Sequence, residues 1–178
     1  MIPEMTERAS KLRARVQEFM DEHILPNESL YYQQIDEGTD RWECPPILDE
    51  LKAKAKAQDL WNLFLPESNR GAGLTNLEYA PISEVMGRVS FGSEVFNCSA
   101  PDTGNMETIA KYGTDQQKEQ WLKPLMKGEM RSAFLMTELT ASYLKPQIEK
   151  MIISHMNGSF RDGGVTSSKQ ASDYMGQP

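Results

Sequence analysis

The feature that most constrains this fold is a spacing that occurs twice, a threonine followed three residues later by glutamate or glutamine. Thr75 precedes Glu78 and Thr114 precedes Gln117 in this way. In such a pair each side chain can satisfy the other residue's free backbone N–H, so the spacing is typical of helix N-termini. We therefore expect one helix to begin at each threonine.

Proline and aspartate mark expected helix boundaries in the first half of the chain. Pro46 suits the first position of a helix, where a missing N–H is not needed. Gln58 and Asp59 are expected to end that helix, because Asp tolerates a left-handed conformation. Pro26 is expected to end the first helix, and residues 29–46 to form a loop whose aromatic side chains pack on the helices.

Glycines mark two further helix ends, at Gly113 and Gly128. Apolar residues also recur at helical spacing, which predicts buried helix faces. The first face comprises Leu12, Val16, Phe19, Met20 and Ile24, and the second Ile47, Leu48, Leu51 and Ala55. Several capped helices with short connections predict an all-α fold, a compact domain of orthogonal or antiparallel helices.

The character of the chain changes near its C-terminal quarter. Residues 132–137 are predicted to form one orphan strand, without a partner for its backbone groups. Residues 144–156 have the spacing of one short helix, and the Gly- and Ser-rich residues 157–178 are expected to be disordered. We therefore divide the chain into a helical domain, 1–138, and a divergent tail, 139–178.

Composition excludes several classes of function. The net charge of -7 argues against non-specific nucleic-acid binding, which needs clustered cations. No apolar run is long enough for a transmembrane segment, and the N-terminus has no pattern of a targeting signal.

Residues that could bind a metal or a cofactor are scattered. Cys44 and Cys98 are expected to be reduced, partly buried thiols. The histidines, His23 and His155, are isolated from other ligand types, so no metal site is predicted. The aromatic residues Trp61, Phe64 and Trp121 are expected in the core rather than as cofactor platforms.

Three stretches taken together are specific enough to suggest a family. They are LPESNRGAGLTNLEYAPISEVMGRVS (65–90), NCSAPDTGNMETIAKYGT (97–114) and YGTDQQKEQWLKPLMKGEMRSAFLMTE (112–138). The chain resembles the N-terminal helical domain of the flavin-dependent acyl-CoA dehydrogenases over roughly residues 8–138. The stretch 97–114 is similar to the branch called acyl-CoA dehydrogenase family members ten and eleven.

The resemblance implies a chemistry and a set of site residues. The family oxidises acyl-CoA to 2-enoyl-CoA with FAD in fatty-acid β-oxidation, and its location would be mitochondrial or peroxisomal. By position, Phe134 and Met136 would supply backbone contacts to the flavin, and Thr137 would hydrogen-bond near its N5 atom. Gly104 and Asn105 lie in the region where relatives line the acyl tunnel, so they are the predicted substrate residues.

Departures from the family pattern follow Glu138. Leu139 replaces the proline of the family's Thr-Glu-Pro, and the small-residue turn that should follow is largely missing. We expect a chain truncated at this point by an alternative exon or a reading-frame slip. It would contain no catalytic residue, would not retain FAD and would be inactive alone.

An alternative from another class is a non-catalytic helical module that associates with intact family members or another partner. The unpartnered strand and the uncovered helical face also predict self-association.

Overall fold

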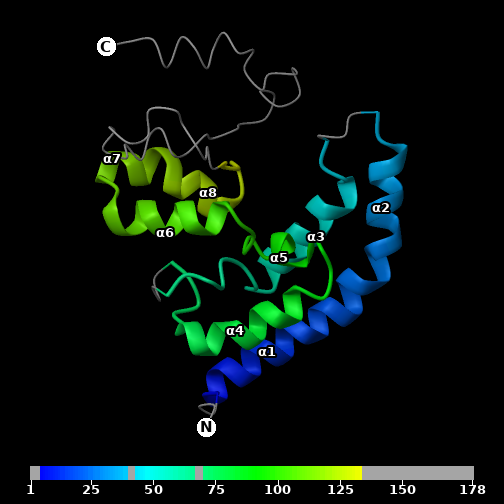
Figure 1. The fold of residues 1–178 in the computed structure, drawn as a ribbon, viewed down its shortest axis with the longest axis horizontal. Coiled ribbons are helices and arrows are strands. Elements are labelled where there is room, and N and C mark those ends of the chain that lie inside the picture. The colour runs from blue at the N-terminus through cyan, green and yellow to red at the C-terminus, as the bar shows by residue number, and fades with distance from the viewer. Residues whose placement is uncertain (1–4, 40–42, 67–69, 134–178) are drawn as a thin grey trace, which may run out of the picture. The chain divides into compact units, whose positions relative to one another are not determined.

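The structure, a computed structural model, describes residues 5–39, 43–66 and 70–133. The chain divides into two compact units, the first ending at Glu107 and the second beginning at Thr108. The elements of the described residues are helices, which confirms the predicted all-α fold (Figure 1). The predicted tail lies outside the described residues, and so does the predicted strand apart from Ser132 and Ala133.

The first unit begins with an unbroken helical run. Helix α1 spans Glu7–Phe19, a π-helical turn η1 spans Met20–Ile24, a 3₁₀ turn η2 spans Leu25–Asn27, and α2 spans Glu28–Glu37. The prediction that Pro26 ends the helix is therefore wrong. Proline cannot donate the next backbone bond of an α-helix, and the run passes Pro26 as a 3₁₀ turn, where Asn27 Nδ2 donates to the His23 carbonyl at 2.8 Å.

Helix α2 also corrects the predicted loop at 29–46, because residues 29–37 of that range are helical. Its formation depends on tertiary contacts. The ring of Tyr31 stacks on Phe91 with centroids 3.8 Å apart, and Gln34 Oε1 accepts from the backbone N–H of Ile47 at 3.0 Å. The expectation that these aromatic residues pack on the helices is confirmed for Tyr31.

Helix α3 spans Pro46–Ala57 and starts at Pro46, as predicted. It lies antiparallel beside α2 (Figure 1). Asp59 follows its end with φ 54°, the left-handed conformation expected there. The whole predicted apolar face of α3 is buried, namely Ile47, Leu48, Leu51 and Ala55.

Helix α4 spans Asn76–Met86 and lies beside α1, with both N-termini at the same end. Glu78 links the two starts: it accepts from the Thr6 hydroxyl at 2.5 Å and from the Thr75 backbone N–H at 2.9 Å. The predicted capping box at Thr75 is thus confirmed. These hydrogen bonds lower the pKa of the Glu78 carboxyl.

The core of the first unit lies between α1, α3, α4 and the short helix α5, Gly92–Val95. Phe19 is 1% exposed, and its ring packs edge-to-face with that of Phe96, with 5.3 Å between the ring centroids. The ion pair between Lys52 of α3 and Glu94 of α5, at 2.9 Å, is largely shielded from solvent. Fully buried large side chains of this unit include Phe19, Phe96, Met20, Ile24, Leu48, Leu51, Leu60, Leu65, Ile82, Met86 and Met106.

Helix α6, Asp102–Tyr112, crosses from the first unit into the second. Gly113 follows its last residue, at a position that needs glycine, since a Cβ there would lie 2.6 Å from the Ile109 carbonyl oxygen. The next helical run consists of α7 (Asp115–Gln117), η3 (Lys118–Leu122) and α8 (Lys123–Lys127).

The predicted punctuation of this second run is also found. Thr114 and Gln117 form the expected capping box, and Gly128 ends the run with φ 71°. Of the aromatic residues expected in the core, Phe64 is buried, whereas Trp61 and Trp121 are partly exposed. No helix in the described ranges is both long and apolar enough to cross a membrane.

The caps give a testable prediction. Thr75→Ala and Thr114→Ala should each lower the free energy of unfolding by about 1 kcal/mol, because each removes the side-chain oxygen that satisfies a helix-terminal N–H. Ser10→Ala, at an exposed position inside α1, is the control and should cause no loss. Urea denaturation followed by circular dichroism measures all three. Threonine variants as stable as the parent would contradict the assigned helix starts.

Candidate functional site

The two predicted substrate residues lie together in the first turn of α6 but differ in environment. Gly104 is exposed, and a Cβ added there would meet nothing within 4 Å. Asn105 is 1% exposed. Gly104 can therefore present a side-chain-free surface to a ligand, whereas the Asn105 side chain is withdrawn from solvent. Contact of either residue with a substrate stays a prediction.

The predicted flavin contacts Phe134, Met136 and Thr137 lie outside the described residues, so their assignment also stays a prediction. The described chain ends one residue before the first of them, at Ala133. The described residues therefore define no geometry for a contact with FAD.

A pair of buried asparagines holds the chain before α6. Asn62 and Asn97 both have positive φ, 55° and 54°, a conformation that Asn tolerates better than most residues. Asn97 Nδ2 donates to Asn62 Oδ1 at 2.7 Å, and the Asn62 backbone N–H donates to the Phe96 carbonyl at 3.0 Å. This pair joins the connection after α3 to the connection that leads into α6.

No sequence pattern predicted this pair. The two asparagines are 35 positions apart, and no spacing rule links residues of two different connections. The one signal in the sequence is local: Asn in a connection is a candidate for the left-handed conformation.

Backbone hydrogen bonds also hold the chain between Asn97 and the start of α6. The Cys98 N–H donates to the Ser93 carbonyl at 2.8 Å, and the Thr103 N–H donates to the Ser99 carbonyl at 3.2 Å. Asp102, 3% exposed, lies in the first turn of α6, where a carboxylate is favourably placed toward the positive end of the helix dipole.

The Cys98 thiol is buried beside Tyr79 of α4. Burial raises the pKa of Cys98 to about 11, although hydrogen bonds with the Tyr79 side chain and the backbone of Phe64 and Leu63 partly oppose the rise. Burial and the adjacent thiol also raise the pKa of Tyr79. Both groups are neutral near pH 7, so Cys98 is a packing residue and not an activated nucleophile.

The two cysteines differ in exposure. Cys98 is buried and Cys44 is exposed, so the expectation that both thiols are partly buried is wrong. Within the described ranges no group of three or more His, Cys, Asp or Glu side chains could hold a metal ion.

Comparison with known proteins identifies the family. Residues 6–129 match the profile of the acyl-CoA dehydrogenase N-terminal domain. The chain belongs to the acyl-CoA dehydrogenase family. It is 45% identical over 157 residues to acyl-CoA dehydrogenase family member 10 of Mus musculus, covering 85% of this chain. It is 42% identical over 178 residues to family member 11 of Rattus norvegicus, covering 96% of this chain.

A solved structure agrees with this assignment. An acyl-CoA dehydrogenase homologue from Mycobacterium abscessus superposes with a TM-score of 0.72 and 50% identity, over 77% of this chain and 36% of that one. The chain covers only 14% of the mouse relative and 22% of the rat relative. A match over 96% of this chain extends beyond residue 138 into the tail.

The asparagine pair gives a second prediction. Asn97→Ala and Asn97→Gly both remove the hydrogen bond to Asn62, but only Ala carries a Cβ that is strained at positive φ. Asn97→Gly should therefore be more stable than Asn97→Ala by about 1 kcal/mol. Thermal and urea unfolding of both variants and the parent provide the measurement. If Ala is tolerated as well as Gly, Asn97 does not adopt the left-handed conformation.

The buried thiol gives a third prediction, about alkaline pH. The folded pKa of Cys98, about 11, lies above the ordinary 9.0, so the unfolded chain loses this proton first. The stabilisation is complete below pH 9 and declines as pH rises toward 11. The raised pKa of Tyr79 acts in the same direction above its ordinary value of 10.0.

Melting temperatures between pH 8 and pH 11 test this dependence. Cys98→Ala should show a smaller fall than the parent across this range, because one of the two contributing groups is gone. Cys44→Ala, which removes an exposed thiol, is the control and should keep the full fall. Identical pH profiles for all three proteins would show that Cys98 ionises equally in the folded and unfolded states.

Proposed function

We propose that this chain supplies the N-terminal helical part of a flavin-dependent acyl-CoA dehydrogenase, which converts acyl-CoA to 2-enoyl-CoA. The family match over residues 6–129, together with the fold similarity to a homologue at 50% identity, carries this proposal. The chain's own contribution is a rigid start of α6 that presents Gly104 toward the acyl group. The absence of a side chain at Gly104 leaves room for a hydrocarbon chain there.

FAD supplies the hydride acceptor of this reaction when it is bound. We propose Phe134, Met136 and Thr137 as its contacts from this chain, and we propose that the 178 residues alone do not retain it. The share of relatives that the chain covers, 14% and 22%, supports this view, because flavin and substrate sites need residues from several elements held rigidly together.

The fourth prediction tests two proposals, that the chain alone does not retain FAD and that it can supply the N-terminal part of an active enzyme. The purified chain should show no stoichiometric flavin absorbance and should not reduce an artificial acceptor with acyl-CoA. A chimera in which residues 1–138 replace the corresponding segment of the Mycobacterium abscessus homologue should bind FAD and oxidise the same acyl-CoA as that homologue. A yellow, active chain would contradict the proposal that the 178 residues alone do not retain FAD. A chimera that holds FAD but has lost the parent's turnover would contradict the proposal that this chain supplies the N-terminal part of an acyl-CoA dehydrogenase.

Gly104→Trp in the chimera tests the position of the acyl group. It should raise KM for long-chain acyl-CoA more than for short-chain acyl-CoA, because the indole fills space that is open over Gly104. Asp115→Asn, in the exposed first turn of α7, is the control and should leave both KM values unchanged. Equal effects on all chain lengths would remove Gly104 from the acyl site.

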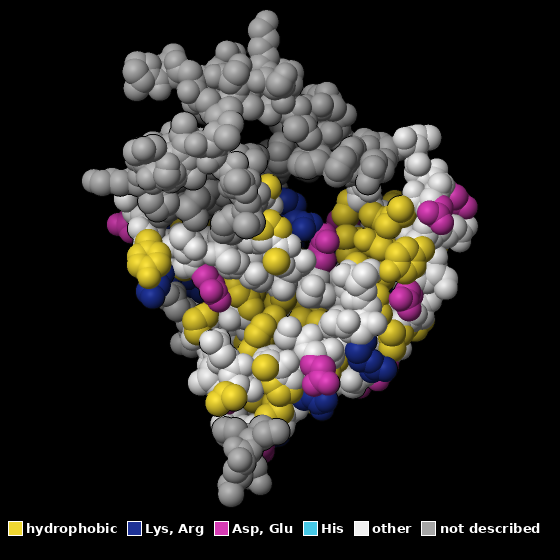
Figure 2. All heavy atoms as spheres, in the orientation of Figure 1, with side chains coloured by type: hydrophobic (Ala, Val, Ile, Leu, Met, Phe, Trp, Pro, Cys, Tyr) yellow, Lys and Arg dark blue, Asp and Glu magenta, His cyan; other side chains and the backbone are white. Residues whose placement is uncertain are grey.

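A helical module that binds a partner remains the second candidate. Helix α2 favours it, because large apolar side chains are exposed there: Leu30 is 37% exposed, Tyr32 44% and Ile35 39%. Hydrophobic atoms gather on the surface where α2 lies (Figure 2). Such a patch is typical of protein interaction sites. Concentration-dependent light scattering, including a Leu30→Lys, Ile35→Lys variant, distinguishes self-association from a monomeric chain.

A further inference from the structure

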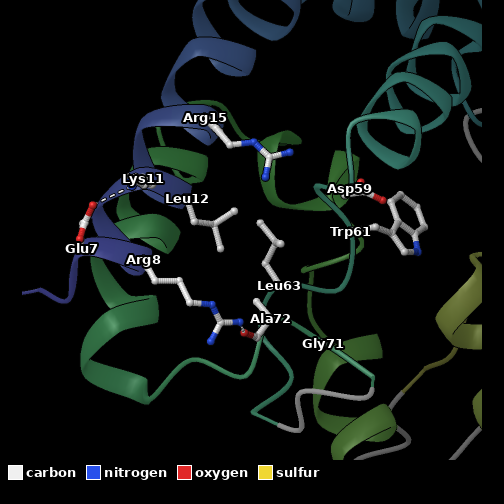
Figure 3. Close-up of a pocket in the computed structure, with 10 residues that line it drawn as sticks. All are labelled: Glu7, Arg8, Lys11, Leu12, Arg15, Asp59, Trp61, Leu63, Gly71 and Ala72. Carbon is white, nitrogen blue, oxygen red and sulfur yellow. Dashed lines mark hydrogen bonds and ion pairs between the residues drawn. The ribbon is translucent and has the colours of Figure 1, made fainter.

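An open groove of about 610 Å³ lies within the first unit, between the polar side of α1 and two stretches of the following connection, residues 59–63 and 71–72. Leu12 and Leu63 face each other across it, and Arg8 and Arg15 extend from α1 toward the two ends (Figure 3). Trp61 lines its edge. Gly104 does not line this groove, and the proposed function gives the groove no role.

The two arginines are held in place by backbone carbonyls. Arg8 donates to the Ala72 carbonyl, and Arg15 donates to the Gln58 carbonyl. Neither guanidinium forms an ion pair within the part of the chain that the structure describes, whereas Lys11 between them pairs with Glu7 at 2.7 Å. A guanidinium has five N–H donors, so each arginine keeps donors for an anion while its backbone contact holds it in place.

The charge of the groove is opposite to that of the chain. The net charge of the chain is -7, yet the lining includes Arg8, Lys11 and Arg15 against the carboxylates of Glu7 and Asp59. Lys11 and Glu7 neutralise each other, which leaves the two arginines against the one carboxylate of Asp59 and a net charge of +1 in the lining. Between the two arginines the lining is apolar: Leu12 is partly exposed, and Leu63 is 2% exposed.

We propose that this groove binds an extended acidic segment of a partner protein, with two carboxylates on either side of an apolar side chain. Arg8 and Arg15 are two helical turns apart, about 10.5 Å along the α1 axis. In an extended chain alternate side chains point to one face, so residues i, i+2 and i+4 can face the groove together over about 13 Å, at roughly 3.3 Å per residue. Carboxylate side chains that lean toward each other make up the difference, so the fitting pattern is Asp or Glu at positions i and i+4, with an apolar residue at i+2.

The composition of the groove favours a protein segment over a small ligand. Arginine and tryptophan are enriched at the residues that dominate protein interfaces. The ends are open, since Arg8 and Arg15 are exposed, and the Lys11 and Glu7 side chains at the rim are 73% and 82% exposed. A continuous peptide can enter and leave such a groove, whereas a small molecule is usually enclosed on most of its surface.

Titration of the chain with the peptide acetyl-Gly-Glu-Ala-Leu-Ala-Glu-Gly-amide tests the proposal. Nuclear magnetic resonance should show saturable shifts at Leu12, Leu63 and the Trp61 indole. A peptide with Gln at both Glu positions should bind at least about tenfold more weakly, because the charge-assisted hydrogen bonds are lost. Equal binding of the two peptides, shifts elsewhere or no binding of either peptide would overturn the proposal.

Variants locate the interaction. Arg8→Gln with Arg15→Gln should abolish the difference between the Glu and Gln peptides. Arg13→Gln with Lys54→Gln also removes two exposed cations but lies outside the groove lining, and should preserve the difference. An equal loss in both double variants would mean non-specific attraction and would overturn the proposal. If the groove variant does not fold, the peptide pair on the parent chain still decides.

The free nonanedioate dianion is the last probe. It carries two carboxylates on an apolar chain but no peptide backbone. The proposal expects it to bind at least about tenfold more weakly than the Glu peptide, because it offers no backbone groups for hydrogen bonds. Equal or tighter binding would assign the groove to small diacids instead of a partner protein.

Discussion

Burial of the apolar side of α1 and η1 is the constraint on which the first unit depends. Val16, Phe19, Met20 and Ile24 are at most 1% exposed, and full burial of one such side chain contributes about 1.5–3 kcal/mol. The neighbouring elements are shaped to reach this surface. Gly92 shows how tight the packing is, because a Cβ there would lie 2.2 Å from the Met86 carbonyl oxygen and 3.4 Å from the Met20 side chain.

The features that sequence could predict are those with local causes. The capping boxes at Thr75 and Thr114 and the left-handed Asp59 need only a few neighbouring residues, and all are found. Pro26 and α2 could not be predicted in the same way. There a local signal for a break is overridden by contacts distant in sequence, such as the stacking of Tyr31 on Phe91.

The candidate site also could be predicted from sequence only in part. Motif positions led to Gly104 and Asn105, but sequence could not show that one is exposed and the other buried. The face of a residue in the first turn of a helix depends on how the preceding chain enters. In this chain Asn62 and Asn97 determine that entry through a buried side-chain hydrogen bond of 2.7 Å. Such a contact becomes visible only when the two connections are placed side by side.

Buried polar groups and exposed arginines thus have different roles in this chain. The buried groups, Asn97 and Cys98, make hydrogen bonds inside the protein, because an unsatisfied buried polar group is costly. They therefore serve to fix the start of α6. Arg8 and Arg15 differ: each bonds a neutral carbonyl at the surface, which leaves its positive charge in place. A charge that is held in position by a neutral group strengthens binding to an anion, since little side-chain freedom remains to be lost.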